Sequence, residues 1–266
     1  MGEIMRIIVT VKQVPNTNEV RWDRSRGTLQ REGVDSIINP EDKNALEAAI
    51  KLKEQHGAEV VVISMGPPQA KKALREVYAL GADRAILVSD RAFAGADTLA
   101  TSYVLSESIR KIGDFDLIFS GRQAIDGDTA QVGPQIAGFL DIPQITYVKD
   151  LKIENKSVKV QKETDFGYQW LEAKTPVLLT FIKEANDPGY PTLRGIFDSF
   201  ERNIEVFSNT ELQLEESRLG LDGSPTKVKK VFKPAPKGKG EIVEEGTARD
   251  MTCKIVDYIK EKNVIR

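Results

Sequence analysis

The sequence predicts an α/β protein with a doubly wound, mostly parallel sheet that carries helices on both faces. Short runs rich in apolar and β-branched residues alternate along its first half with longer stretches of helical periodicity. The runs are apolar throughout, as is typical of parallel strands buried on both faces and joined by right-handed crossovers. Rossmann-like folds of this class bind nucleotides at the carboxyl ends of their strands, where the strand order reverses.

Each element of this first half has its own signal. The expected strands are 6–11, Glu59–Met65, Arg84–Val88 and 115–120, and the expected helices are 40–53, 69–80, 97–113 and 131–140. Asn39 is the expected N-cap of the first helix, with Pro40 at its first position and Gly57 just past its end. His56 lies in the last turn of this helix, where we expect a solvent-exposed residue rather than a catalytic residue or a ligand.

The second half predicts a sheet extension and then a tail. Shorter strands at 144–151, 157–161, 168–173 and Val177–Phe181 are expected to extend the sheet at one edge, and 183–193 is expected to be an exposed loop. We place the nucleotide-binding domain at 1–207. Residues 208–266 then form a Pro-, Gly- and Lys-rich arm at 227–240 and an amphipathic helix near 247–262. The apolar face of this helix is expected to pack on a partner subunit, with packing on its own domain as the alternative.

Composition excludes several classes of function. The 38 Lys and Arg nearly balance the 40 Asp and Glu, which argues against a nucleic-acid or membrane-surface partner. With one histidine and one cysteine, Cys253, we expect no intramolecular disulfide, no multi-thiolate metal site and no His-based catalytic residue. No signal peptide or membrane-spanning run is apparent, so a cytoplasmic protein is expected.

The segment 121–134 is the most informative part of the chain. It follows an apolar strand, is rich in Gly, Asp and Thr, and leads into a helix. Such a layout suits phosphate, because glycines allow close backbone approach and the first helical turn offers free N–H groups. Asp126 and Asp128 would repel phosphate unless they cap the helix, bind a sugar hydroxyl or turn away. An acidic turn with a helix cap is the alternative.

Several motifs together resemble the β subunit of electron-transfer flavoproteins. They are 9–15 (VTVKQVP), 39–42 (NPED), 64–67 (SMGP), 81–84 (GADR) and 121–126 (GRQAID), and 186–193 (NDPGYPTL) resembles the family's partner-recognition loop. The resemblance covers residues 7–206. It implies an α-subunit partner carrying FAD and a second nucleotide site here, which holds AMP in the mitochondrial type.

Two segments resemble the electron-bifurcating branch, in which FAD replaces AMP. These are 14–17 (VPNT), with Asn16 where the branch usually has Asp, and 126–134 (DGDTAQVGP). The implied function is hydride transfer from NADH to this FAD. One electron then goes to ferredoxin, and the other goes through the α-subunit FAD to an acyl-CoA dehydrogenase-type flavoprotein.

The expected site residues follow from the strand ends and the resemblance together. The cofactor-binding residues are Thr10, Asn39, Met65, Gly66, Thr98, Thr101, Gly121, Gln123, Asp126, Gly127, Asp128, Thr129, Gln131, Val132 and Gly133. Thr129 and Gln131 are expected at the pyrophosphate and Asn39 at the adenosine end. For Thr98 and Thr101 the alternative is bonding to their own helix. Tyr190 and Leu193 are expected to contact the dehydrogenase.

Three alternatives remain. The first is a non-bifurcating electron-transfer flavoprotein with AMP in this site. The second is a regulatory adenine-nucleotide-binding protein of the universal-stress type. The third is an arm that binds nucleic acid, which the balanced charge and the absence of stacking aromatics in 227–240 disfavour.

Overall fold

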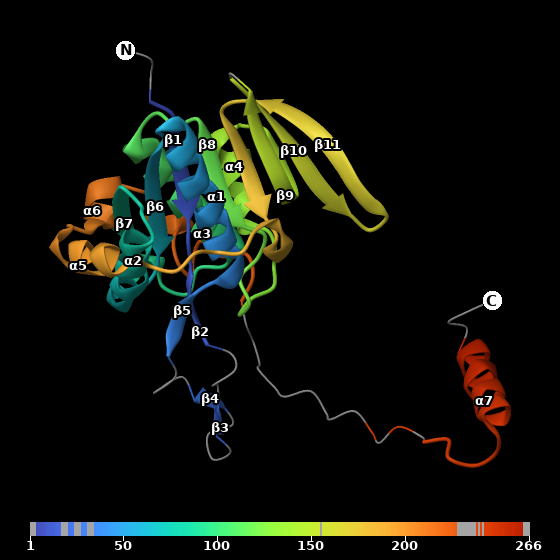
Figure 1. Cartoon of the computed structure of the whole chain (residues 1–266). Coiled ribbons are helices and arrows are strands. Elements are labelled where there is room, and N and C mark those ends of the chain that lie inside the picture. The colour runs from blue at the N-terminus through green and yellow to red at the C-terminus, as the bar shows by residue number, and fades with distance from the viewer. Residues whose placement is uncertain are drawn as a thin grey trace. The chain divides into compact units, whose positions relative to one another are not determined.

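The chain forms two compact units. A computed structural model of the chain describes residues 4–16, 21–23, 28–30, 35–154, 156–227, 238, 240 and 242–262. The first unit is Met1–Lys229 and the second is Lys230–Arg266. The first unit contains the sheet and its covering helices, and Figure 1 shows its elements.

A nine-stranded sheet among the described residues organises the first unit. Its order is β11 (Gly167–Lys174), β10 (Ser157–Thr164), β9 (Gln144–Glu154), β12 (Val177–Phe181), β8 (Leu117–Gly121), β1 (Arg6–Thr10), β6 (Glu59–Met65), β7 (Arg84–Val88) and β13 (Glu205–Phe207). Pairing is parallel from β9 to β13 and antiparallel through β9, β10 and β11. The expected doubly wound sheet, extended at one edge, is confirmed.

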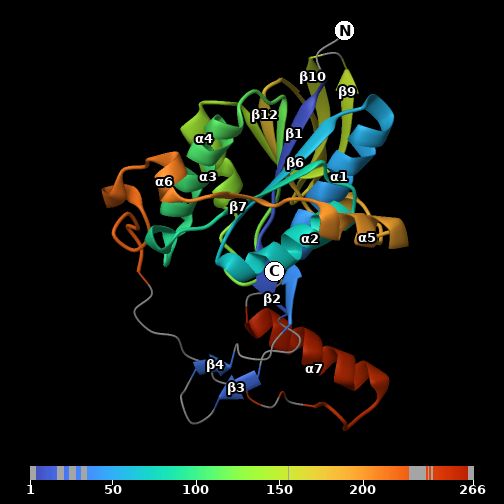
Figure 2. The ribbon, with the colours of Figure 1, turned by 90° about the vertical axis from the view of Figure 1, so that its left-hand side faces the viewer.

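Helices cover both faces of this sheet, as Figure 2 shows. On one face lie α1 (Pro40–His56) and α2 (Lys71–Ala79), and on the other lie α3 (Thr98–Ile112) and α4 (Val132–Leu140). The alternation of side chains along β1 explains the two layers, because Ile7 and Val9 pack in one core and Ile8 in the other. Two small antiparallel ribbons, β2 (Gln13–Pro15) with β5 (Ser36–Ile38) and β3 (Arg21–Asp23) with β4 (Thr28–Gln30), precede α1.

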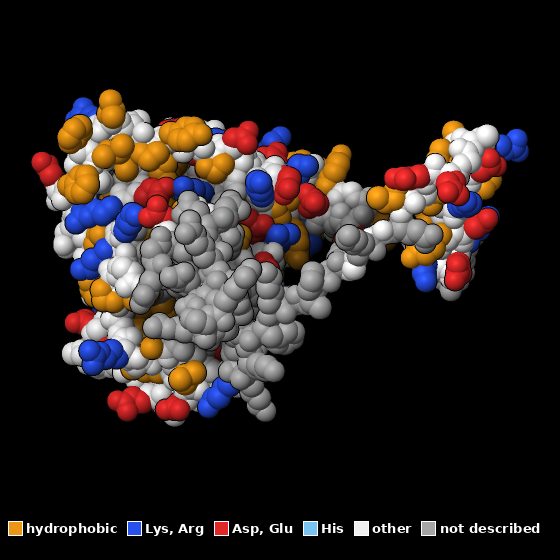
Figure 3. All heavy atoms as spheres, turned by 90° about the horizontal axis from the view of Figure 1, so that it is seen from below, with side chains coloured by type: hydrophobic (Ala, Val, Ile, Leu, Met, Phe, Trp, Pro, Cys, Tyr) orange, Lys and Arg blue, Asp and Glu red, His pale blue; other side chains and the backbone are white. Residues whose placement is uncertain are grey.

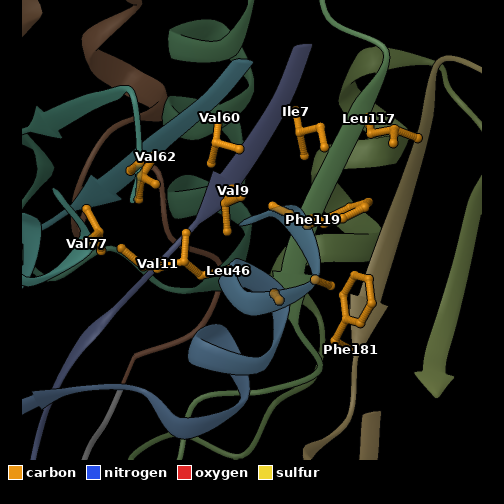
Figure 4. Close-up of a cluster of buried hydrophobic side chains, with 14 of the residues drawn as sticks. Ile7, Val9, Val11, Leu46, Val60, Val62, Val77, Leu117, Phe119 and Phe181 are labelled. Carbon is orange, nitrogen blue, oxygen red and sulfur yellow. The ribbon is translucent and has the colours of Figure 1, made fainter. Parts of the chain in front are cut away.

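The core beneath α1 fixes the strand ends that matter for the site. Figure 4 shows Leu46 of α1 among side chains from several strands, including Val9 and Phe119. The rings of Phe119 and Phe181 lie 4.8 Å apart between centroids and are tilted by 59°, a favoured arrangement for buried aromatics. This packing holds β1, β8 and β12 in register against α1.

Several elements lie where no sequence pattern predicts them. Residues 193–201 form the helix α5 (Leu193–Glu201), so Leu193, expected in a loop, is the first residue of a helix. Thr192 caps α5 by accepting a hydrogen bond from the Gly195 N–H at 2.9 Å. A short strand, β13, follows and pairs with β7. The long helix expected at 69–80 is a 3-10 turn, Pro68–Ala70, followed by α2.

The first unit also extends past the expected boundary at residue 207. The short helix α6 (Asn209–Leu212) packs on α3, and Leu219, only 3% exposed, joins the core on that face. Ser224 is buried as well. Residues 208–227 therefore belong with the α/β unit in the structure, and the chain leaves that unit only at Lys229.

The second unit contains the helix α7 (Ala248–Glu261), as its periodicity predicts. Thr247 and Asp250 form a capping box at its start, and no residue of this helix is buried. Most of the arm expected at 227–240 lies outside the described residues. Across the described part of the chain, none of the helices combines the length and apolar character needed to cross a membrane.

Candidate functional site

A large cleft lies where the order of strands reverses. The chain runs from β1 outward to β6 and β7, and then returns to β8 on the other side of β1. Thr10 at the end of β1 and Gly121 at the end of β8 both line this cleft, which has a volume of about 1050 Å³. It is therefore at the position where open parallel sheets bind ligands.

The structure brings most of the expected cofactor residues together. Those that line the cleft are Thr10, Met65, Gly66, Thr98, Thr101, Gly121, Gln123, Gly127, Thr129, Gln131, Val132 and Gly133. They come from the ends of β1, β6 and β8 and from the starts of α3 and α4. Thr98 does not bond to its own helix in the structure, because its Oγ1 donates to Gln131 Oε1 at 3.2 Å and links α3 to α4.

Asn39, Asp126 and Asp128 do not line the cleft. Asp126 turns to Lys12, whose Nζ donates to its carboxylate at 2.7 Å, and Asp128 accepts from Gln123 Nε2 at 3.1 Å. Of the three arrangements considered for these acids, the structure therefore has the one in which both carboxylates turn away from the cleft. Asn39 is fully buried and is the N-cap residue of α1, as expected, but its side chain makes no cap hydrogen bond.

The first turn of α1 instead binds the segment that follows β8. Asn39 donates from Nδ2 to the Gln123 carbonyl at 2.8 Å and accepts from the Ile125 N–H at 3.1 Å. Glu41 accepts from the Gln123 N–H at 2.9 Å, and Asp42 accepts from the N–H groups of Gly121 at 3.0 Å and Lys12 at 2.7 Å. The turn therefore joins the carboxyl ends of β1 and β8.

Burial perturbs both acids of this turn. Desolvation raises the pKa of Asp42 to about 7, against the lowering effect of its backbone N–H donors. Desolvation also raises the pKa of Glu41, although its ion pair with Arg122, 2.7 Å from Nη2 to Oε1, opposes the shift. Asp42 itself lines the cleft. A carboxyl group that titrates near neutrality thus lies at the junction of the two strands.

The start of α4 offers donors for an anion. Gln131, its N-cap residue, makes no side-chain cap hydrogen bond, so the N–H groups of Val132 and Gly133 are left to favour negative charge, while Pro134 has no N–H. A Cβ on Gly133 would lie 2.7 Å from Ser120 Oγ, so only glycine allows this helix start to lie so close to β8. A Cβ on Gly127, in contrast, would meet no atom within 4 Å.

Sequence reasoning named no site residue in one wall of the cleft and none of its cations. That wall is the loop between β7 and α3, at a strand end expected to lie at the cleft, and it includes Ser89, Asp90 and Phe93. The cations are Lys12, Arg91 and Arg122. Asp90 accepts from the Ala92 and Asn209 N–H groups, which lowers the pKa of its carboxyl. The end of β7 and the Arg122 in the 121–126 motif were signals that could have identified these residues.

Asp97 connects that wall to the end of the first unit. Its carboxylate caps α3 through the N–H groups of Leu99 and Ala100, at 3.0 and 3.1 Å, and accepts from Thr226 Oγ1 at 2.7 Å. Because both Asp90 and Asp97 are committed to backbone donors, neither directs an unpaired carboxylate at the cleft.

Comparisons with known proteins decide the family. Residues 26–212 match the model of the electron transfer flavoprotein domain. The chain is 51% identical to an electron transfer flavoprotein subunit beta of Clostridium acetobutylicum, over 98% of this chain and all of that protein. The chain belongs to the family of electron transfer flavoprotein beta subunits. This membership excludes the universal-stress alternative and implies an α-subunit partner and a flavin- or AMP-related nucleotide site.

Other relatives of this beta subunit carry more specific names. The caffeyl-CoA reductase-Etf complex subunit CarD of Acetobacterium woodii is 50% identical over 98% of this chain and all of that protein. The acryloyl-CoA reductase electron transfer subunit gamma of Anaerotignum propionicum is 44% identical over the same shares of the two chains.

The two expected partner residues of this beta subunit lie apart from the cleft. Tyr190 is 94% exposed and Leu193 is 79% exposed, and neither lines the cleft. Ile196, Phe197 and Phe200 of α5 are exposed too. Figure 3 shows hydrophobic side chains gathered near one corner of the first unit (upper left in that view). The exposed apolar group on and before α5 is therefore larger than the two residues that we expected.

Proposed function

We propose that this beta subunit binds FAD in the cleft and is part of an electron-bifurcating electron-transfer flavoprotein. In this proposal NADH is the hydride donor. Ferredoxin takes one electron, and an acyl-CoA dehydrogenase-type flavoprotein takes the other through the α-subunit FAD. The cleft volume of about 1050 Å³ is the single observation that carries the choice of cofactor.

The cleft fits a dinucleotide better than a mononucleotide. Its volume lies just above the ~300–1,000 Å³ that is usual for ligand sites. Its lining comes from the ends of several strands and the starts of two helices, and it includes Met65 on β6 and Val132 on α4. AMP, with one phosphate and no second ring system, would leave much of this space to water. We therefore favour FAD.

The donor set fits a diphosphate. Free N–H groups at the start of α4, with the hydroxyl of Thr129, would hold the phosphates. Gly127 leaves open space where a side chain would intrude. Arg122 lines the same cleft, and its buried Nε has no hydrogen-bond partner among the described residues. A cation so placed would favour a ligand that carries negative charge.

The chain supplies binding and electrostatics rather than acid–base catalysis. Bound here, FAD would supply both two-electron exchange with a hydride donor and one-electron exchange with the acceptors. The residues that line the cleft would orient the cofactor, and Arg122, which pairs with Glu41, would lie at the wall of its site. The one histidine and one cysteine of the chain agree with this division of roles.

The names of two relatives support the acyl-CoA part of the proposal. One belongs to a caffeyl-CoA reductase complex and the other serves an acryloyl-CoA reductase. A heterodimer purified with its α subunit tests the cofactor assignment by flavin analysis. Two FAD per heterodimer support it, whereas one FAD with one AMP supports the non-bifurcating alternative.

A further inference from the structure

The first turn of α1 contacts the segment after β8 in a regular pattern. We call residues 121–125 the cleft loop. Its alternate N–H groups donate to successive side chains of the turn: Gly121 to Asp42, Gln123 to Glu41 and Ile125 to Asn39, at 3.0, 2.9 and 3.1 Å. The turn therefore binds one side of the cleft loop as a neighbouring strand would.

The cleft loop lies between this turn and the cleft. Gly121, Arg122, Gln123 and Ala124 line the cleft, whereas Asn39 and Glu41 do not. The Arg122 N–H donates to the carbonyl of Phe181 at 2.8 Å, which ties the loop to β12 as well. The atoms that a ligand would meet are thus placed by bonds made on the loop's far side.

These side chains are committed to the loop. Asn39 is fully buried, and Glu41 and Asp42 are 8% and 7% exposed, so each depends on its hydrogen bonds to offset the free energy of desolvation. The approach is so close that a Cβ on Gly121 would lie 2.3 Å from Asp42 Oδ1. A change in this turn must therefore move the loop or leave a buried polar group unpaired.

We propose that Asn39 and Glu41 are positioning residues that set the nucleotide affinity of the cleft through the cleft-loop backbone, without touching the ligand. This inference rests on the proposed function only in taking the ligand to be a nucleotide. It assigns Asn39 a role different from the adenosine contact that the family resemblance implies.

The same helix provides matched controls. Asn44 is also buried, and its Nδ2 donates to the carbonyl of Asn186 at 2.7 Å. Glu47 accepts from the Gly189 N–H at 3.0 Å. Asn44 therefore repeats the buried amide of Asn39, and the half-buried Glu47 repeats the backbone N–H bond of Glu41, each on a segment that does not line the cleft.

The experiment measures nucleotide affinity and thermal stability of the heterodimer formed with the α subunit. Dissociation constants for FAD and for AMP at the beta-subunit site are compared for Asn39→Ala with Asn44→Ala, and for Glu41→Ala with Glu47→Ala. We expect both members of a pair to lower Tm. Asn39→Ala and Glu41→Ala should weaken binding at least about tenfold, whereas the controls change it by less than about twofold.

A rescue variant separates the backbone bond from the ion pair. Glu41→Gln can still accept from the Gln123 N–H but loses the charge that pairs with Arg122, so we expect most of the affinity to return. If Asn39→Ala does not fold, Asn39→Ser replaces it. Equal losses of affinity in test and control variants, or unchanged affinity in both test variants, would overturn the proposal. Because AMP is measured beside FAD, a site that prefers AMP refutes the proposed cofactor and still tests the positioning role.

Discussion

At the scale of single residues, three glycines of the site do different work. Gly121 and Gly133 permit close backbone packing, since a Cβ on either would lie within 3 Å of a neighbouring atom. Gly127 has open space around it and lines the cleft. Gly127 is therefore the position where a side chain can be added to block the ligand without disturbing the protein.

We predict that Gly127→Arg abolishes FAD binding in this subunit and leaves the α-subunit flavin in place. The long side chain would occupy the space of the diphosphate, while the fold survives because no neighbouring atom obstructs the new Cβ. The measurement is flavin content of the purified heterodimer. Gly138→Arg on α4, which also meets no atom within 4 Å, is the control. Two bound FAD in Gly127→Arg would refute the placement of the cofactor.

Asp42 makes stability depend on pH. Because burial raises its pKa from 3.8 to about 7, the folded protein holds a proton that the unfolded chain releases between these values. Stability from this group is therefore greatest at low pH and falls as pH rises through that window, by at most ~1.4 kcal/mol per pH unit.

We predict that Asp42→Asn removes this fall. Urea unfolding at several values between pH 4.5 and 7, with wild type alongside, measures the slope against pH. The variant should be less stable overall, because an amide NH₂ faces a backbone N–H, but its slope should be flatter by up to ~1.4 kcal/mol per pH unit. An identical slope in both proteins would show that Asp42 does not titrate in this range.

At the scale of elements, strands and helices with strong local patterns could be predicted and those without could not. β6, β7 and β12 lie where their apolar runs predict them. α5 was missed because Pro191 and Gly195 make its sequence resemble a loop. Its stability comes from the Thr192 cap and from close packing on α2. The packing requires glycine at position 195, because a Cβ added there would lie 2.5 Å from the Ala79 carbonyl oxygen.

We predict that Leu193→Ala slows electron transfer to the dehydrogenase and leaves reduction of the bound flavin by NADH unchanged. Leu193 is 79% exposed at the start of α5, so it is available to a partner and contributes little to the fold. Burying one leucine at an interface is worth ~2 kcal/mol, enough to change affinity more than tenfold. Stopped-flow measurement of the two steps, with Leu171→Ala on β11 as the control, checks this. Equal loss of both steps would mean that Leu193 is structural, and loss of neither would mean that α5 is not the docking site.

At the scale of the whole molecule, the α/β unit could be predicted and its true end could not. Residues 208–227 have few apolar residues in any regular period, yet Leu219 and Ser224 are buried and Thr226 bonds to Asp97. The position of the cleft could likewise be predicted, from the carboxyl ends of the strands. The hydrogen bonds of Asn39 could not be predicted, because its partners Gln123 and Ile125 are 84 and 86 positions later in the sequence.

We propose that the second unit packs on the partner subunit, and we predict that truncation after Lys229 weakens heterodimer formation while the first unit stays folded. The unburied helix α7 has no core of its own to stabilise it. Truncation after Val206 should in addition destabilise the first unit, because it removes the buried Leu219. Analytical ultracentrifugation and thermal unfolding separate the two effects. Unchanged heterodimer affinity after truncation at Lys229 would mean that α7 does not contact the partner.

The central claim is that the cleft of this beta subunit holds FAD that NADH can reduce. The most direct test counts the flavin of the purified heterodimer and titrates it anaerobically with NADH. The account predicts two FAD per heterodimer, with bleaching of the flavin absorbance by NADH that Gly127→Arg abolishes. One FAD per heterodimer with AMP in the second site, and no bleaching by NADH, would contradict it.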